Sequence, residues 1–282
     1  MSGGPPPARA VRSIAFRAGG FAFGERSVPD EVAIAVSVNG TTHAVMMATP
    51  RDVEELGLGL ALAERIVEHP HEIERMEVAE TEAGIDCRLW LNEARSGIYT
   101  ARRRMMTGPV GCGLCGVESL ELAAPPLPSV AGVGLVLGPA EIAAAFEAMY
   151  REQALSRLTR AVHAAGFFSP ERGLVVVRED VGRHNALDKV VGFLARERIE
   201  PASGLVLVTS RVSVELIQKT AVMGAGMLAA VSAPTALGVE TAEAVGLTLV
   251  AVVRGEEFEI LTHPHRVAGA VEAGRERPDG VR

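Results

Sequence analysis

Aromatic side chains are scarce in this sequence, and long hydrophobic runs are absent. Phe, Trp and Tyr make up 4% of the 282 residues, although 48% of all residues are hydrophobic and the mean hydropathy is +0.22. Such a composition excludes an intrinsically disordered chain and predicts a core of small aliphatic side chains, as in layered α/β domains. The longest apolar runs, such as residues 247–253, are far shorter than the roughly 20 residues that cross a bilayer. The N-terminus also lacks the apolar stretch of a signal peptide, so we expect a cytoplasmic protein that has no membrane partner.

The chain also lacks a basic net charge and has few cysteines. Its formal net charge of -7 and its pI near 5.6 give no positive field that would hold a nucleic-acid duplex, so we expect no nucleic-acid partner. Three cysteines, an odd number with no signal sequence, argue against a secreted disulfide scaffold. In a reducing compartment, two closely spaced cysteines indicate a reactive or metal-binding pair.

The first part of the chain predicts a small α+β domain over residues 13–124, behind a disordered tail at residues 1–12. Alternating apolar residues at positions 31–48 are interrupted by Asn39-Gly40, the strongest short signal for a β-hairpin. A helix is expected between residues 49 and 69, because apolar residues recur there with helical spacing. Further strands are expected at residues 73–79, 85–91 and 97–100.

A linker rich in Pro and Gly at residues 125–138 precedes an α/β domain at residues 139–282. A long helix is predicted from Pro139 to Gly166. After it, continuously aliphatic strands alternate with helices, which predicts a mainly parallel sheet covered on both faces. In such sheets ligands bind beyond the carboxyl ends of the strands. The loops that follow the strands there are residues 178–184, 209–213, 232–235 and 254–257.

Cys112 and Cys115 form a Cys-x-x-Cys pair with glycine before, between and after the two thiols. Glycine disfavours both helix and strand, so we expect this pair on a mobile loop. The thiolate is the reactive form of cysteine, and the arginines at positions 102–104 would favour it if they lie near the loop. The pair could cycle between dithiol and disulfide, bind a metal, or accept a sulfur atom as a persulfide and pass it on.

A zinc site needs about four ligands, and the other residues do not complete one. Cys87 falls in a predicted strand, where alternation turns its side chain into the core. The histidine pairs at positions 69/71 and 263/265 flank prolines in loops, and no histidine has the glutamate two residues later that zinc deaminases use. A thioredoxin-like pair would stand early in a βαβ unit, whereas this pair follows the first unit, so a redox role ranks second. We therefore predict no metal site.

Two polar loops precede predicted helices in the α/β part. Ser210, Arg211 and Ser213 lie between an aliphatic strand and a helix, where hydroxyls, backbone N–H groups and a guanidinium attract anions such as phosphate. Ordinary helix capping by Ser210 or Ser213 is the alternative. The stretch from Glu179 to Lys189 is unusually polar for a strand-to-helix turn. Within it, His184 is a candidate for ligand contact or proton transfer, with an ordinary surface histidine as the alternative.

Together these motifs resemble the FdhD family of formate dehydrogenase accessory sulfurtransferases. The resemblance covers nearly the whole chain after the tail, and the long polar stretch is far more specific than the cysteine pair. The matching segments are residues 112–116, 179–190, 210–213, 218–219, 232–237, 254–255 and 262–264, with residues 38–40 and 47–50 near the front.

The resemblance implies a sulfur carrier that accepts a persulfide from a cysteine desulfurase and transfers the sulfur to the molybdenum cofactor, a bis-molybdopterin guanine dinucleotide, for formate dehydrogenase. It also implies a homodimer, and a cytidine-deaminase-like layered α/β domain with a smaller N-terminal α+β domain and without the deaminase zinc. Cys112 and Cys115 would carry the sulfur. The residues that would contact the dinucleotide are Ser210, Arg211, Ser213, His184, Val252, Val253, Arg254, Gly255 and Glu256.

Two other classes of function stay open on the sequence alone. A non-catalytic chaperone for the molybdenum cofactor would bind the dinucleotide and the apoenzyme without using its thiols. A dithiol oxidoreductase would instead form a reversible disulfide between Cys112 and Cys115.

Overall fold

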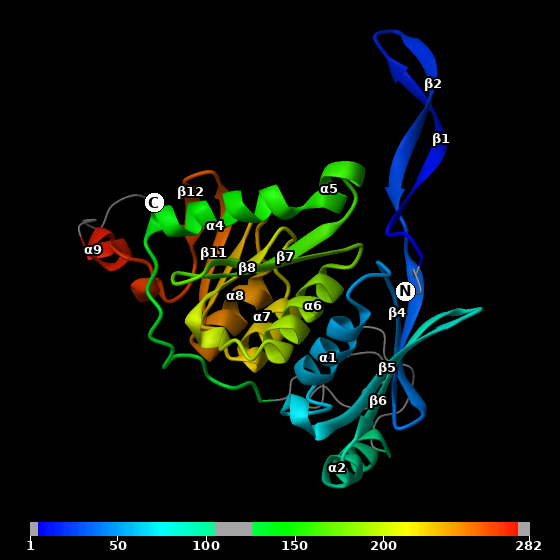
Figure 1. The fold of residues 1–282 in the computed structure, drawn as a ribbon. Helices are drawn as coiled ribbons and strands as arrows, with labels where there is room; N and C mark the ends of the chain where they lie inside the picture. Colours follow the sequence, from blue (N-terminus) through cyan, green and yellow to red (C-terminus); the bar gives the residue numbers. More distant parts are fainter. Residues whose placement is uncertain (1–4, 105–125, 276–282) are drawn as a thin grey trace. The chain divides into compact units, whose positions relative to one another are not determined.

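The computed structural model describes residues 5–104 and 126–275 (Figure 1). Two compact units divide the chain, and both are discontinuous in sequence. Unit 1 comprises Met1–Pro125, Gln153–Ala164 and Arg178–Gly192, and unit 2 comprises Pro126–Glu152, Ala165–Val177 and Phe193–Arg282. Residues 153–164 and 178–192 thus group with the N-terminal segment, an exchange of segments that a linear division at residues 125–138 does not anticipate.

A four-stranded sheet with strand order β4-β3-β6-β5 forms the framework of unit 1. Its strands are β3 (Val32–Val38), β4 (Thr41–Ala48), β5 (Ile73–Thr81) and β6 (Gly84–Leu91). The predicted hairpin turn is confirmed, because Asn39 and Gly40 both have positive φ, 49° and 78°, as a two-residue type I′ turn requires. β3 pairs antiparallel with β4 and parallel with β6, so Val36 lies beside both Ala44 and Cys87.

The core of unit 1 lies between this sheet and a helix. Among the described residues, the helices that lie in unit 1, wholly or in part, are α1 (Val53–Ala63), η1 (Pro70–Glu72), α2 (Glu93–Arg104), α5 (Ala154–Thr159) and α6 (Arg183–Arg196). α1 buries Leu56 and Leu60 in one core cluster with Ile34 and Leu89 of the sheet. The strand expected at residues 97–100 is wrong, because this segment lies inside α2. Asn92 starts that helix by accepting a hydrogen bond from the Arg95 N–H (2.9 Å).

Helices α1 and α6 approach each other through two glycines. A Cβ atom on Gly59 would lie 1.7 Å from the carbonyl oxygen of Asp188, and one on Gly192 would lie 2.0 Å from the carbonyl oxygen of Glu55. No side chain fits at such distances, so these glycines set the spacing of the two helices. Residues 178–192 are thereby packed tightly onto the N-terminal segment.

The N-terminal strands β1 (Ala8–Arg17) and β2 (Gly20–Pro29) form an antiparallel hairpin, a two-stranded sheet of its own. Its turn residues Ala18 and Gly19 have φ of 48° and 81°. Near its base, the Arg26 guanidinium donates a hydrogen bond to the carbonyl oxygen of Thr159 (3.2 Å). β1 begins inside the segment predicted as a disordered tail, and Ala-Gly is a weaker turn signal than the Asn-Gly of the next hairpin.

Unit 2 is built on a six-stranded sheet with order β12-β11-β10-β9-β7-β8. The strands are β7 (His163–Ser169), β8 (Gly173–Asp180), β9 (Leu205–Val208), β10 (Met227–Ala230), β11 (Thr248–Arg254) and β12 (Glu257–Ile260). β9, β10 and β11 are parallel, whereas β12 pairs antiparallel with β11 and β7 pairs antiparallel with β9. The expectation of a mainly parallel sheet is therefore wrong, since only the centre of a mixed sheet is parallel.

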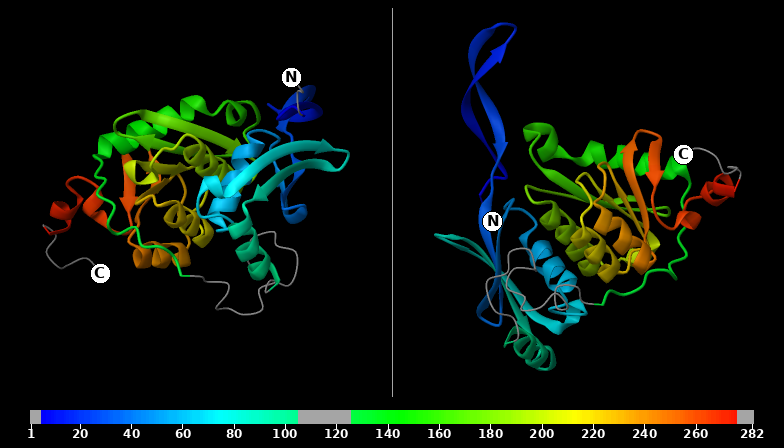
Figure 2. Two further views of the ribbon diagram at one scale, coloured as in Figure 1. Left: turned by 60° about the horizontal axis from the view of Figure 1, so that its bottom comes forward. Right: turned by 180° about the vertical axis from the view of Figure 1, so that it is seen from behind.

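Both faces of the parallel strands are covered, as predicted. Alternate residues such as Leu205, Leu207 and Met227 share a core cluster with α4 (Pro139–Glu152). The helices α7 (Val214–Met223) and α8 (Ala236–Val245), which connect the parallel strands, lie on the opposite face (Figure 2). No helix in the described part of the chain is long and apolar enough to span a membrane.

The long helix predicted from Pro139 to Gly166 is wrong beyond residue 152. α4 ends there, the short α5 ends at Arg160 in the left-handed conformation (φ 56°), and β7 follows. Both helices carry apolar residues at helical spacing, which hides the break between them in the sequence.

Arg266 anchors the segment that enters unit 2. It lies in η3 (Pro264–Arg266), between η2 (Pro201–Ser203) and the C-terminal α9 (Ala270–Arg275) in chain order. Its guanidinium is almost fully buried, and burial lowers its pKa. It donates hydrogen bonds to the oxygens of Val130, Ala131, Val133, Gly246 and Thr248, at 2.8–3.1 Å. One side chain thus fixes residues 130–133 to the turn before β11.

Candidate functional site

Three loops meet at the carboxyl ends of the parallel strands of unit 2. Residues 209–213 follow β9, residues 231–235 follow β10, and residues 252–256 surround the end of β11. Because these strands are adjacent and parallel, their carboxyl ends lie along one edge of the sheet. This is the edge at which the sequence predicts ligand binding.

Backbone hydrogen bonds join the first two loops. Val212 and Pro234 form a parallel β-bridge, and the Thr235 N–H donates to the carbonyl oxygen of Val212 (2.9 Å). Each loop then starts a helix. Ser213 is the N-cap residue of α7, and Thr235 caps α8 by accepting a hydrogen bond from the Gly238 N–H (3.2 Å). Two helix N-termini are therefore held side by side at the edge.

The third loop is tied to the second by Arg254. Its Nη1 donates to the carbonyl oxygens of Val231 and Val253. Just before it, the pairing of β11 with β12 is interrupted by a bulge, and Val252 has a φ of 55°, a rare conformation for a β-branched residue. Gly255 also has positive φ, 58°. Strained backbone of this kind is concentrated at functional sites, which makes this loop a candidate part of one.

The predicted residues at this edge play different parts. Ser210 is buried, and its hydroxyl donates to the carbonyl oxygen of Arg211 (3.1 Å), so it supports the loop from inside. Arg211 is exposed. Ser213 does not cap α7 with its side chain, and its buried hydroxyl oxygen makes no hydrogen bond to any residue that the structure describes. An exposed guanidinium, an unused hydroxyl and two helix N-termini are the elements of an anion site.

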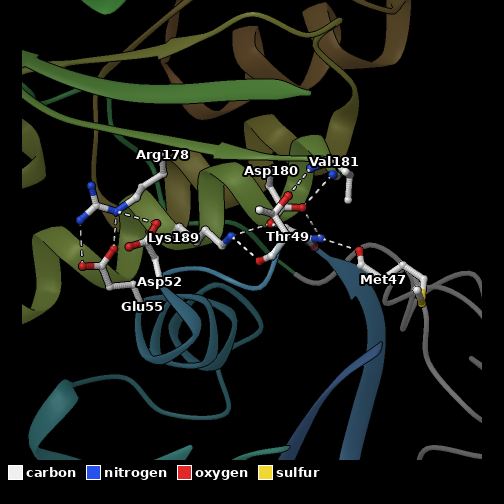
Figure 3. Close-up of polar contacts among 10 residues, drawn as sticks. Met47, Thr49, Asp52, Glu55, Arg178, Asp180, Val181 and Lys189 are labelled. Carbon is white, nitrogen blue, oxygen red and sulfur yellow. Dashed lines mark hydrogen bonds and ion pairs between the residues drawn. The ribbon is translucent and has the colours of Figure 1, made fainter. Parts of the chain in front are cut away.

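The polar stretch that begins at Glu179 forms a buried network within unit 1 (Figure 3). Asp180 is at its centre. One carboxylate oxygen accepts hydrogen bonds from Lys189 Nζ (2.6 Å) and the Thr49 N–H (3.1 Å), and the other accepts from the Gly182 N–H (2.8 Å) and Asn185 Nδ2 (3.0 Å). Lys189 Nζ also donates to the carbonyl oxygen of Thr49 (3.1 Å). Asp180 and Lys189 both have no exposed side-chain area.

The network joins the start of α6 to the junction of β4 and α1. Asn185 donates to the carbonyl oxygen of Met47 (3.0 Å), and the Val181 N–H donates to the Thr49 hydroxyl (3.2 Å). These groups are thus occupied within the protein. Most of the residues that make this stretch so polar hold the fold together, which was not predicted from the sequence. The signal was a lysine at a helical position close to the core-facing Leu187 and Val190.

An ion pair and a helix cap also stabilise this region of unit 1. Arg178 forms a two-pronged ion pair with Glu55 (2.5 and 2.9 Å). Burial alone would lower the pKa of Arg178, but the hydrogen bond to Glu55 and the charges of Asp52 and Glu55 raise it above its ordinary value. Glu179 accepts hydrogen bonds from the N–H groups of residues 155 and 156, so it caps α5.

Arg183 and His184 occupy the first turn of α6 and are partly exposed. The Nε of Arg183 is buried without a hydrogen bond to a described residue. Burial lowers the pKa of His163, and the positive charge of Arg183 lowers it further. His184 belongs to unit 1, whereas the other predicted dinucleotide contacts belong to unit 2. Its part in a common site stays a prediction.

Cys112 and Cys115 lie outside the described residues. The third cysteine, Cys87, lies in β6 with no exposed area, as alternation predicts. Burial raises its pKa to about 12, so this thiol stays protonated and unreactive. Over residues 5–104 and 126–275, no group of three or more His, Cys, Asp or Glu side chains is placed to hold a metal ion.

Two of the arginines before the cysteine pair, Arg102 and Arg103, have partners in the fold. Arg102 donates to the carbonyl oxygens of Glu64 (2.7 Å) and Arg65 (3.2 Å), and Arg103 donates to that of Thr42 (3.1 Å). These bonds attach the last turn of α2 to the end of α1 and to β4.

Comparison with known proteins gives consistent results. The FdhD/NarQ family matches residues 29–268. A protein of Agrobacterium fabrum named sulfur carrier protein FdhD is 51% identical over 259 residues, 92% of this chain and 96% of that protein. A protein of the same name from Bordetella petrii is 44% identical, over 85% of this chain and 86% of that one. A crystal structure described as a candidate formate dehydrogenase accessory protein, from Desulfotalea psychrophila, is 26% identical with a TM-score of 0.74, covering 93% of this chain and 100% of that one.

Proposed function

Because this chain belongs to the FdhD/NarQ family, we propose that it is a sulfur carrier in the maturation of formate dehydrogenase. A cysteine desulfurase loads a sulfur atom onto Cys112 as a persulfide. The protein then delivers this sulfur to a bis-molybdopterin guanine dinucleotide that it holds as substrate, in the cytoplasm and as a homodimer. The names of its relatives support the role of sulfur carrier, and the loops at the edge of the parallel strands support the binding of the dinucleotide.

The sulfur chemistry needs two thiols. In loading, the Cys112 thiolate attacks the outer sulfur of the desulfurase persulfide; the sulfur–sulfur bond of the donor breaks, and the donor cysteine leaves as a thiolate. In delivery, the Cys115 thiolate attacks the inner sulfur of the Cys112 persulfide. Hydrosulfide leaves toward the molybdenum centre, and a Cys112–Cys115 disulfide forms. A dithiol reductant then restores the pair, so electrons balance over the cycle.

The dinucleotide site follows from charge and geometry in unit 2. The pyrophosphate groups suit the N-termini of α7 and α8 and the exposed guanidinium of Arg211, while the Ser213 hydroxyl offers a further hydrogen bond. Residues 252–256 supply the irregular backbone that lets a ligand approach β11. His184, which belongs to unit 1, is a proposed contact on the family resemblance alone.

A labelling experiment tests the sulfur role. The full-length protein is incubated with a cysteine desulfurase and cysteine labelled with sulfur-35, and the label is located by peptide mass mapping under non-reducing conditions. Label is expected on Cys112 and is lost in a Cys112→Ala variant. Cys87 serves as an internal control, because its buried, protonated thiol stays unlabelled. Label on neither Cys112 nor Cys115 refutes the proposal.

A cofactor chaperone is the second candidate, because the anion site of unit 2 uses no thiol. A variant with both Cys112→Ala and Cys115→Ala separates the two. If it still supports full formate dehydrogenase activity in cells that lack the wild-type protein, the chaperone is correct and the sulfur carrier is wrong.

A further inference from the structure

The hairpin of β1 and β2 has one strongly apolar face. Its register pairs Ile14 with Phe23 and Phe16 with Phe21, so these four side chains lie on the same face. The other face of the same region carries small residues, with Ala15 opposite Ala22 and Ser13 opposite Gly24. The four large side chains are 61–88% exposed. Three of the eight phenylalanines of an aromatic-poor chain are thus placed in water.

An uncovered hairpin of this composition needs a partner surface. A two-stranded ribbon is marginally stable in water unless its apolar face is packed. From the size of such side chains, roughly 500 Å² of apolar surface is open on this face, as much as the largest patch on most monomers. Two such patches, each packed on a second molecule, bring the total buried area of an interface near the standard size of roughly 1,600 Å².

The charge of the hairpin indicates what it packs on. Residues 8–29 contain four arginines and one glutamate, whereas the whole chain has a net charge of -7. The hairpin is therefore basic, and the remainder of this same chain is acidic. A second copy therefore carries, outside its own hairpin, a net charge of opposite sign to that of the hairpin.

Unit 1 also carries a receiving surface. Val45 and Met47 of β4 are 54% and 51% exposed, and their register places them beside Ala35 and Ala33 of β3. On the same face, Asp86 of β6 lies next to Ala35 and forms an ion pair with Arg88 (2.8 Å). The strip is therefore an exposed apolar surface, which complements the apolar face of the hairpin.

We propose that the β1–β2 hairpin of one copy packs its Phe face on the Val45–Met47 strip of a second copy. The contact is reciprocal, so each dimer contains it twice, related by a two-fold axis. The homodimer itself belongs to the proposed function, whereas the inference concerns the surface through which it forms. The inference does not depend on the sulfur chemistry. Sulfur-35 loading, measured for each variant, therefore tests the proposed function separately from the dimer contact.

Analytical ultracentrifugation of the full-length chain tests the contact with three variants. Phe21→Ser with Phe23→Ser alters the hairpin, Val45→Glu alters the strip, and Leu237→Ser, exposed to a similar degree in α8, is the control. The first two are expected to weaken the dimer about 100-fold, and the control to leave it unchanged. An equimolar mixture of the hairpin and strip variants is expected to dimerise more tightly than either alone, because the mixed dimer keeps one intact contact.

Hydrogen exchange locates the interface. Amides of residues 11–25 are expected to exchange more slowly at protein concentrations where the dimer forms than at concentrations where it dissociates. The inference is overturned if the wild-type chain is monomeric throughout, if the dimer forms with this hairpin unprotected, or if the mixed variants dimerise no better than the separate ones. A monomer that sediments with vesicles of anionic lipid also overturns it, since the hairpin then packs on a membrane.

Discussion

Removing the ammonium group of Lys189 should strongly destabilise unit 1. Lys189→Met keeps most of the length of the side chain but deletes its hydrogen bonds to Asp180 (2.6 Å) and to the carbonyl oxygen of Thr49 (3.1 Å). The carboxylate of Asp180, with no exposed area, is then a buried charge without its counter-charge. Breaking a buried pair in this way costs about 3–5 kcal/mol, a large part of the free energy of unfolding of most domains.

Urea denaturation followed by tryptophan fluorescence measures this loss. Trp90 is the only tryptophan of the chain and lies in β6, so its emission reports on unit 1. The transition of Lys189→Met should move to lower urea with little change in slope. Lys219→Met is the matched control: Lys219, the only other lysine, is partly exposed in α7 of unit 2, and its loss should shift the tryptophan transition by less than about 1 kcal/mol.

A second substitution tests the cause. Asp180→Asn removes the unpaired charge but keeps an oxygen that can accept from the Thr49 or Gly182 N–H. Added to Lys189→Met, it should recover part of the lost stability. The reasoning is refuted if Lys189→Met costs no more than the control, or if the double variant is less stable than the single one.

Three further predictions concern other groups. Burial raises the pKa of Cys87 from 9.0 to about 12, so as pH rises the unfolded chain loses this thiol proton before the folded chain does. From pH 9 upward, the Cys87 thiol should therefore lower the free energy of unfolding by about 1.4 kcal/mol per pH unit. Urea titrations at pH 8.5–10.5 should show this slope in the wild type and not in Cys87→Ala. Arg254→Ala should weaken the binding of GDP, used as a probe in calorimetry, about tenfold, and an unchanged affinity would place the nucleotide elsewhere. Arg266→Met leaves five buried or partly buried acceptors without their donor, so it should lower the free energy of unfolding by at least about 2 kcal/mol. Denaturation followed by circular dichroism measures this loss. A smaller loss would mean that water replaces the guanidinium.

Local patterns predicted the parts of the fold that local chemistry determines. Asn39-Gly40 forms its turn because both residues tolerate positive φ, and Cys87 faces the core because strand alternation requires it. The aliphatic runs at residues 205–208 and 248–253 are buried parallel strands, and the loops after them meet at one edge. In each case the information lies within a few residues of the element.

Other features depend on contacts distant in sequence. Lys189 is polar enough to suggest a ligand, but its partner Thr49 is 140 residues away, so only the folded chain shows that both serve the fold. Residues 163–166 of the antiparallel strand β7 were predicted as the end of a helix, because an Ala- and Gly-rich sequence is compatible with either element. Pairing with β9 makes this segment a strand. The β1–β2 hairpin was not predicted, and its apolar face stays exposed in the described part of the chain. The roles of Cys112 and Cys115 stay predictions.

The discontinuity of unit 1 has a consequence during synthesis. A ribosome that has made the first 104 residues has produced the whole four-stranded sheet, but not Asp180, Lys189 or the glycine on α6 that fits against α1. At roughly 5–20 residues per second, the nascent sheet waits for several seconds before residues 178–192 emerge from the exit tunnel. Throughout that interval its unfinished core, and the exposed phenylalanines ahead of it, are surfaces that chaperones would bind.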